Sequence, residues 1–185
     1  MRLLPNARMR GAGQRGQTTA EFVIVFPMLI LLFFLMLEFG WLLKNWIVVT
    51  NSAREAARCA IAQSCAIDGT PTDPVTLIFS RLGSGITGNL DVNRDGKLDA
   101  ADVDIDIEIV DNDGNSTPTA GDSLVVCIQA GNKPITPAPV FLSAGTLPDP
   151  LPLAAREEMI IEFGLPADWN DWASMSNDDG ECDFS

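Results

Sequence analysis

The sequence predicts an α+β protein in which a long N-terminal transmembrane helix extends into a small antiparallel β-sheet domain. Three observations predict this fold: an apolar run over residues 22–43, a helix-forming stretch that follows without a break, and later segments whose apolar residues alternate as in strands. We divide the chain into a basic leader (1–16), a transmembrane and extramembrane helix (17–66), an acidic α+β domain (67–163) and an acidic tail (164–185).

The apolar run is long enough to cross a bilayer. It contains one charged residue, Glu38, and as a helix it would be roughly 33 Å long, against about 30 Å for the hydrocarbon core. Arginines precede the run and Lys44 follows it, so the positive-inside rule places the N-terminus in the cytoplasm and the C-terminal domain outside it. A removable signal peptide is disfavoured, because the run exceeds the usual apolar region and no small-residue cleavage site follows closely.

Two features of this helical segment each allow two interpretations. Glu38 either pairs with another subunit inside the membrane or lies at the outer interface and reaches water, which we favour. Residues 46–66 contain no Gly or Pro, and their small residues recur at three- and four-residue spacing. This smooth face fits either a second helix from another subunit or the chain's own domain, and the sequence does not separate the two. The small residues are Ala53, Ala56, Ala57 and Ala60.

Charge is distributed unevenly along the chain. From Cys59 onward there are 22 acidic and 5 basic residues, whereas residues 1–20 contain four arginines and no acid. An acidic body repels nucleic acid, so we expect no nucleic-acid partner. The chain has no histidine, which excludes Ser-His-Asp and Cys-His nucleophile systems, and no carboxylate pair stands out as a hydrolase centre. We therefore expect no enzymatic activity.

A glycine and a glutamate are placed in an unusual way just before the span. Residues 15–22 read RGQTTAEF, and a bare anchor gains little from a carboxylate in its first turn. If a protease cut after Gly16, Gln17 would become a new N-terminus whose ammonium can meet the Glu21 carboxylate of a neighbouring subunit. The two charges neutralise each other only when subunits stack in the correct axial register. We therefore take Gly16, Gln17, Glu21 and Phe22 as a candidate processing site.

These residues resemble the type IV prepilin processing site, and residues 15–60 resemble the N-terminal signature of the TadE-like family of tight-adherence (Flp-type) pilus pseudopilins. That signature has a Glu-Phe opening the span, a proline inside it, a Glu-Phe-Gly near its end and an Asn-x-Ala-Arg-Glu-Ala-Ala-Arg helix. It is carried here by Glu21, Phe22, Pro27, Glu38, Phe39, Gly40, Asn51, Ala53, Arg54, Glu55, Ala56, Ala57 and Arg58. Residues 123–129 and 152–157 are similar to the family more loosely.

The resemblance implies a minor pilin or pseudopilin that takes part in pilus assembly and cell adhesion. It implies processing by a prepilin peptidase at the bacterial inner membrane, with a periplasmic or extracellular domain. The implied partners are other pilins or pseudopilins and the pilus assembly machinery. The alternative is an uncleaved, membrane-tethered calcium-dependent binding module or adhesin, which would keep residues 1–16.

Residues 91–102 (DVNRDGKLDAAD) fit the template of a calcium-binding loop and are not part of that family pattern. Gly96 occupies the sixth position, and Lys97 the seventh, where a backbone carbonyl is the ligand. The segment resembles one calcium repeat of the dockerin or EF-hand type, closed by Asp instead of Glu. We expect Ca²⁺ here; the alternative is a solvated turn. The side-chain ligands would be Asp91, Asn93, Asp95, Asp99 and Asp102.

Three strands are expected in the acidic domain: Val103 to Val110, Leu124 to Ile128, and Met159 to Phe163. Residues 111–115 resemble a metal site but are better explained as the turn between the first two strands. A proline-rich loop should fill residues 133–152.

Four cysteines in an exported chain indicate disulfides, and three pairings are conceivable. Cys59 and Cys65 can bridge only if the helix ends between them. We favour Cys59–Cys65 together with Cys127–Cys182.

Overall fold

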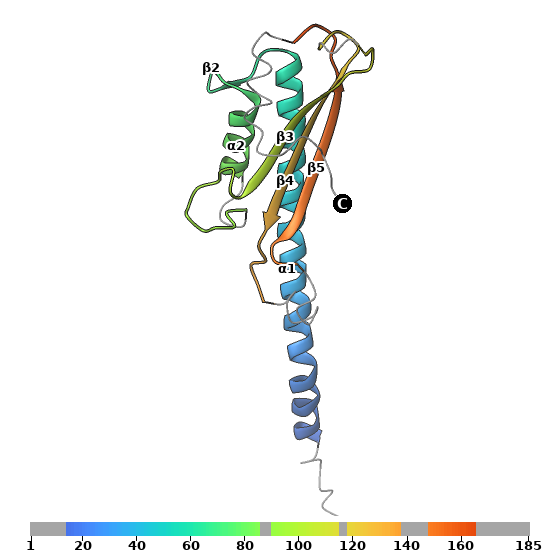
Figure 1. Cartoon of the computed structure of the whole chain (residues 1–185). Helices are drawn as coiled ribbons and strands as arrows, with labels where there is room; N and C mark the ends of the chain where they lie inside the picture. Colours follow the sequence, from blue (N-terminus) through green and yellow to red (C-terminus); the bar gives the residue numbers. More distant parts are fainter. Residues whose placement is uncertain (1–13, 86–89, 115–117, 138–147, 166–185) are drawn as a thin grey trace, which may run out of the picture.

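The computed structural model describes residues 14–85, 90–114, 118–137 and 148–165. Its architecture is the predicted α+β arrangement. The C-terminal half of a long helix, α1 (Gln14–Ile61), packs between a short helix and a three-stranded antiparallel sheet, and the N-terminal half projects away from them (Figure 1). The expected leader up to residue 13 and the expected tail from residue 166 lie outside the described residues.

The projecting half of α1 is apolar and exposed. The helix has 48 residues, which corresponds to about 72 Å. None of its residues from Thr19 to Leu37 is buried, and this stretch is about 28 Å long, close to the thickness of a hydrocarbon core. Its most apolar window has a mean hydropathy of 2.7 and is 6% buried, whereas a helix from a soluble core would be mostly buried. This half is therefore a candidate transmembrane helix.

The other half of α1 forms the centre of the domain. The small-residue face predicted from the sequence is fully buried there, between the short helix α2 (Pro74–Gly85) and the sheet. Small side chains allow both neighbours to approach closely, as the spacing predicts. Of the two interpretations of this face, packing on the chain's own domain is correct. Its four residues, each with no exposed surface, are Ala53, Ala56, Ala57 and Ala60.

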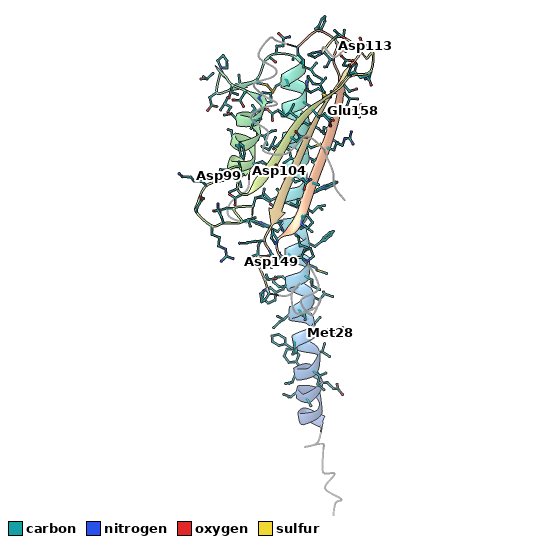
Figure 2. The ribbon with its side chains drawn as sticks, viewed as in Figure 1. Met28, Asp99, Asp104, Asp113, Asp149 and Glu158 are labelled. Atoms are coloured by element: carbon teal, nitrogen blue, oxygen red, sulfur yellow. A yellow bond between two sulfur atoms is a disulfide. The ribbon has the colours of Figure 1, made fainter. Side chains whose placement is uncertain are left out.

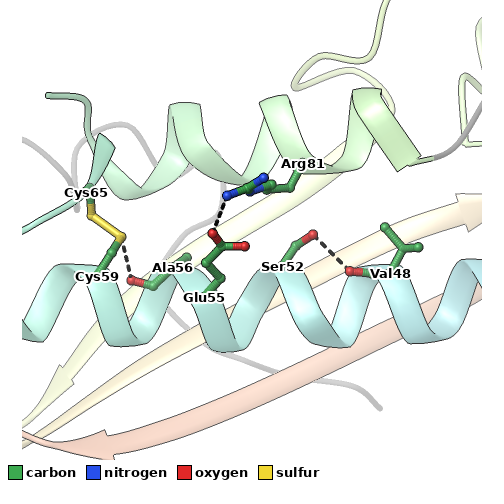
Figure 3. A network of polar contacts seen from close by, with 7 residues as sticks. All are labelled: Val48, Ser52, Glu55, Ala56, Cys59, Cys65 and Arg81. Atoms are coloured by element: carbon green, nitrogen blue, oxygen red, sulfur yellow. Dashed lines mark hydrogen bonds and ion pairs between the residues drawn. A yellow bond between two sulfur atoms is a disulfide. The ribbon is translucent and has the colours of Figure 1, made fainter. Parts of the chain in front are cut away.

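Helix α2 was not predicted, although the sequence contains its start signal. Asp73 caps the helix by accepting hydrogen bonds from the backbone N–H of Thr76 at 2.7 Å and from its hydroxyl at 2.7 Å. Pro74 then occupies the first helical position, which its fixed φ favours. On the facing surfaces of the two helices, Arg81 forms an ion pair with Glu55 of α1 at 2.5 Å (Figure 3).

The sheet consists of β3 (Val103–Val110), β4 (Ser123–Asn132) and β5 (Leu151–Ile160), in the order β3-β4-β5. Both pairings are antiparallel, with Ile105 opposite Ile128 and Ile128 opposite Ala155. Alternate residues of each strand are buried in one core together with residues of α1, which contacts β4 and β5 directly. The largest buried side chains of this core are Ile78, Leu82, Leu90, Ile105, Leu124, Ile128 and Ile161.

The expected strand boundaries were correct for the first strand and too narrow for the second. The third expectation was wrong, because β5 begins at Leu151, inside the segment expected to be a loop, and ends at Ile160. Pro152 lies within this strand opposite Gly131. A proline is tolerated there because β5 is an edge strand, whose outer N–H groups need no partner in the sheet.

The disulfide Cys59–Cys65 is present, which confirms that pairing. Helix α1 ends at Ile61, between the two cysteines, and their Cα atoms lie 4.7 Å apart. Cys127 is also disulfide-bonded and lies on the face of β4 that points away from α1. Cys182, its predicted partner, lies outside the described residues. After the first disulfide, β1 (Ala66–Ile67) and β2 (Thr70–Pro71) pair in a short hairpin.

Candidate functional sites

The candidate processing site lies at the start of α1. Gly16 and Gln17 belong to the first turns of the helix, and the structure describes their backbone only. Glu21 follows Gln17 by four residues, about 6 Å along the axis and on the same side of the helix. It is exposed, as is Phe22, whose ring stacks on Phe26 with centroids 5.1 Å apart. The site is thus continuous with the exposed apolar half of the helix.

Glu38 marks the level at which the domain begins to contact α1. Its side chain is 6% exposed, and its carboxylate accepts hydrogen bonds from the backbone N–H of Ile135 at 2.9 Å and of Thr136 at 3.0 Å. The hydroxyl of Thr136 adds a third donor at 3.1 Å. The favoured interpretation, in which Glu38 reaches water, is therefore wrong: the carboxylate is buried and bound by groups of its own chain.

We call residues 133–137 the helix-docking loop, because this segment bridges the end of β4 and α1. Just before the loop, the buried Asn132 accepts a 2.5 Å hydrogen bond from Asn45 of α1. The first residue of the loop, Lys133, donates to the backbone carbonyl of Val92. Together with the contacts at Glu38, these bonds fix the lower end of the sheet to the helix. In Figure 2, Met28 lies on the helix below this level, outside the domain.

The predicted cation loop adopts the compact turn that its sequence requires. Asp91 accepts hydrogen bonds from the backbone N–H of Asp95 at 3.2 Å and of Gly96 at 2.9 Å. Gly96 has a φ of 84° and Arg94 a φ of 62°, and a left-handed conformation at the sixth position is the reason for glycine there. The chain therefore folds back on itself within six residues, and this directs several carboxylates inward.

Three of the predicted side-chain ligands converge. One carboxylate oxygen from each of Asp91, Asp95 and Asp102 lies within 4.8 Å of the other two. Asn93 lies next to them and accepts a 2.9 Å hydrogen bond from the N–H of Asp95. The carboxylate of Asp99 does not belong to this group, and it accepts a 2.9 Å hydrogen bond from the N–H of Ala101. The seventh position, Lys97, is exposed, and its N–H donates to Asp95.

Asp102, the last residue of the loop, is buried, with 7% of its surface exposed. Its Oδ1 atom accepts hydrogen bonds from the N–H groups of Val92 at 2.8 Å and Asn93 at 3.0 Å. Its Oδ2 atom is also buried, and no hydrogen-bond partner for it exists among the described residues. A buried carboxylate oxygen without a hydrogen-bond partner is energetically costly.

A second acidic group, Asp111, Asp113 and Asp122, lies at the other end of the sheet, in the connection from β3 to β4. Figure 2 shows Asp113 at this end, well away from Asp99. Here the buried residue, Asp122, has partners on both oxygens, among them the N–H groups of Thr119 and Asn112. These donors, Thr119 first, lower the pKa of Asp122 against the opposing effect of burial. The group is explained as a hydrogen-bonded turn, as the sequence indicated.

A shallow hollow of about 430 Å³ lies beside the cation loop. It is lined by residues 100–104, by the end of β4 and by the start of β5, with Asp102 and Asp104 among its acidic side chains. Gly131 forms part of its wall, and a Cβ atom on Gly131 would come within 2.6 Å of the Pro150 ring and within 2.9 Å of the Val92 side chain. Val92 belongs to the cation loop, so the loop is packed tightly against the end of β4.

Taken together, these features define a class of protein in which an exposed apolar helix, a candidate membrane anchor, continues without interruption into the core of a small α+β head. Residues 16–58 match the family model described as TadE-like protein, and the resemblance seen in the sequence is thereby confirmed over this segment. The match begins at the candidate processing glycine and ends at Arg58 in the buried half of α1. Neither the curated proteins nor the solved structures gave a match to the chain.

Proposed function

We propose that this chain is a minor pilin or pseudopilin that takes part in assembly of a tight-adherence pilus, with a structural role and no catalytic one. The observation that carries the proposal is the TadE-like segment, which spans the processing glycine, the exposed apolar helix and the start of the buried helix. Residues 19–37 anchor the chain in the bacterial inner membrane. The arginines before them remain in the cytoplasm, and the acidic head faces the periplasm or the exterior.

The exposed half of α1 supplies the surface for assembly. In the membrane its apolar side chains contact lipid, and in a filament they contact the same half of other pilins or pseudopilins. The backbone of this helix needs no outside partner in either environment, because its N–H and C=O groups bond to each other. The head needs no rearrangement on transfer, since its core closes on α1 above Glu38.

The charge pair at the start of the helix would set the register of assembly. A prepilin peptidase that cuts after Gly16 frees the ammonium of Gln17, and this group meets Glu21 of a neighbouring protomer. A carboxylate buried among apolar helices without a partner carries a large desolvation penalty, so arrangements that leave Glu21 unpaired are disfavoured. The support from the structure is that Glu21 is exposed on the projecting helix and not engaged in the core of the domain.

The proposal is tested by incorporation into filaments in cells that carry the pilus machinery. A C-terminally tagged chain should co-purify with sheared filaments or with the assembly complex, and Gly16→Ala should abolish this. Gly13→Ala is the matched control, because it makes the same change in the leader three residues away and should leave incorporation intact. Glu21→Ala should still insert into the membrane but fail to incorporate. Normal incorporation of both Gly16→Ala and Glu21→Ala would refute the proposal in favour of an uncleaved membrane tether.

A further inference from the structure

We propose that residues 91–102 bind one Ca²⁺ ion through Asp91, Asp95 and Asp102, and that the bound ion stabilises the attachment of the head to its anchor helix. The inference is independent of any role in a pilus. It rests on the geometry of the loop and on the contacts that join this loop to the helix-docking loop. It also rests on the buried Oδ2 atom of Asp102, which has no hydrogen-bond partner among the described residues and which we call the orphan oxygen.

The spacing of the carboxylates fits a calcium ion. Ligand oxygens lie about 2.4 Å from Ca²⁺, so two ligands on opposite sides of the ion are about 4.8 Å apart. The three carboxylate oxygens lie within 4.8 Å of one another. The neighbouring side-chain oxygen of Asn93 and the Lys97 carbonyl are hard oxygen donors of the kind that Ca²⁺ prefers, and the left-handed Gly96 permits the turn that brings them together.

The orphan oxygen distinguishes this loop from an ordinary acidic turn. Asp102 is more than nine-tenths buried, and its Oδ2 atom has no hydrogen-bond partner among the described residues, although its Oδ1 atom has two. In the Asp111–Asp113–Asp122 group the buried carboxylate is satisfied on both oxygens by groups of its own turn. A cation would satisfy Asp102 and relieve repulsion among the three carboxylates, whereas the second group has no such unmet requirement.

Val92 connects the cation loop to the helix-docking loop and to β4. Its N–H donates to Asp102, its carbonyl accepts a hydrogen bond from Lys133, and its side chain lies against Gly131 of β4. Lys133 begins the helix-docking loop, whose amides at Ile135 and Thr136 bind Glu38 on α1. An ion that fixes Asp102 and Asp91 therefore fixes Val92, and through Lys133 it restrains the segment that holds the head to the anchor.

Binding is tested by calorimetric titration of the full chain in detergent with calcium chloride. We expect one ion per chain with a Kd of about 10⁻⁴–10⁻³ M, the range of extracellular calcium modules. Asp95→Asn, at an exposed ligand, should weaken binding about tenfold or more, and Asp113→Asn, the same change in the second acidic group, should leave it unchanged. No binding up to about 10 mM calcium, well above that range, would overturn the proposal, as would binding lost in Asp113→Asn and kept in Asp95→Asn.

The coupling is tested by hydrogen exchange of the amides of Ile135 and Thr136. If release of the ion accompanies opening of the helix-docking loop, calcium at ten times the Kd should slow exchange by up to about tenfold. Lys133→Met removes the bond to Val92 and spares every ligand, so it should keep calcium affinity and lose the calcium effect on exchange. Exchange that calcium does not change in the wild-type chain, or slows equally in Lys133→Met, would overturn the coupling.

Discussion

Glu38 offers the sharpest test of how the head is attached to its anchor. Glu38→Ala removes a carboxylate that accepts from two backbone N–H groups and one hydroxyl, all in the helix-docking loop. Hydrogen bonds to charged groups are each worth about 1.5–3 kcal/mol, but water can reach part of an exposed loop, so we expect a total loss of about 2–4 kcal/mol. At about 2–4 °C per kcal/mol, the Tm of the head should fall by about 4–16 °C.

The assay is thermal unfolding of the full chain in detergent, followed by near-ultraviolet circular dichroism, with hydrogen exchange at Ile135 and Thr136 as a local probe. Glu38→Gln keeps one acceptor oxygen and loses the charge, so it should cost about 1–2 kcal/mol. Glu21→Ala is the control, because it removes an acid from the same helix outside the head and should leave the Tm unchanged. A Glu38→Ala chain with the wild-type Tm and unchanged exchange at both amides would refute the attachment described above.

Three further substitutions test a close packing contact, a hydrogen-bonded carboxylate and the disulfide of the head. Gly131→Ala places a Cβ atom within 2.6 Å of the rigid ring of Pro150, and the resulting overpacking should destabilise the head by about 1–3 kcal/mol in urea titrations. Backbone donors led by Thr119 lower the pKa of Asp122 in the folded state. The ionised carboxylate therefore stabilises the head above a pH of about 3.9, and this stabilisation is lost as the pH falls through the lower folded-state pKa. Asp122→Asn should reduce the fall of the Tm at acidic pH. Cys65→Ser opens a disulfide between residues six apart and should cost about 2 kcal/mol, whereas a Tm that is insensitive to both this change and reductant would contradict a stabilising role.

The sequence predicted those features that depend on local pattern. Alternation of apolar and acidic residues gave β3 its correct bounds, because the apolar face of that strand is buried in the core. The condition that the helix must end between Cys59 and Cys65 was met at Ile61. The length and apolarity of residues 22–43 predicted the projecting helix, since no small domain can cover such a run on all sides.

The features that the sequence did not predict depend on tertiary contacts, except for helix α2, whose start signal is local. Pro152 predicts a loop by itself, yet β5 begins at Leu151 and includes it. The proline is tolerated because β5 lies at the edge of the sheet, which the local sequence does not reveal. Helix α2 could have been found from its Asp-Pro start. The partners of Glu38 are backbone amides up to 98 residues away, and amides carry no side-chain signature. The orphan oxygen of Asp102 likewise requires coordinates, although the loop itself was recognisable.

The proposal that this chain is a processed, membrane-anchored pilin-like subunit is tested most directly by the intact mass of the protein extracted from membranes of pilus-producing cells. We expect a polypeptide that begins at Gln17, and a Gly16→Ala variant that retains residues 1–16. A wild-type chain that still carries those sixteen residues in cells with an active prepilin peptidase would contradict it.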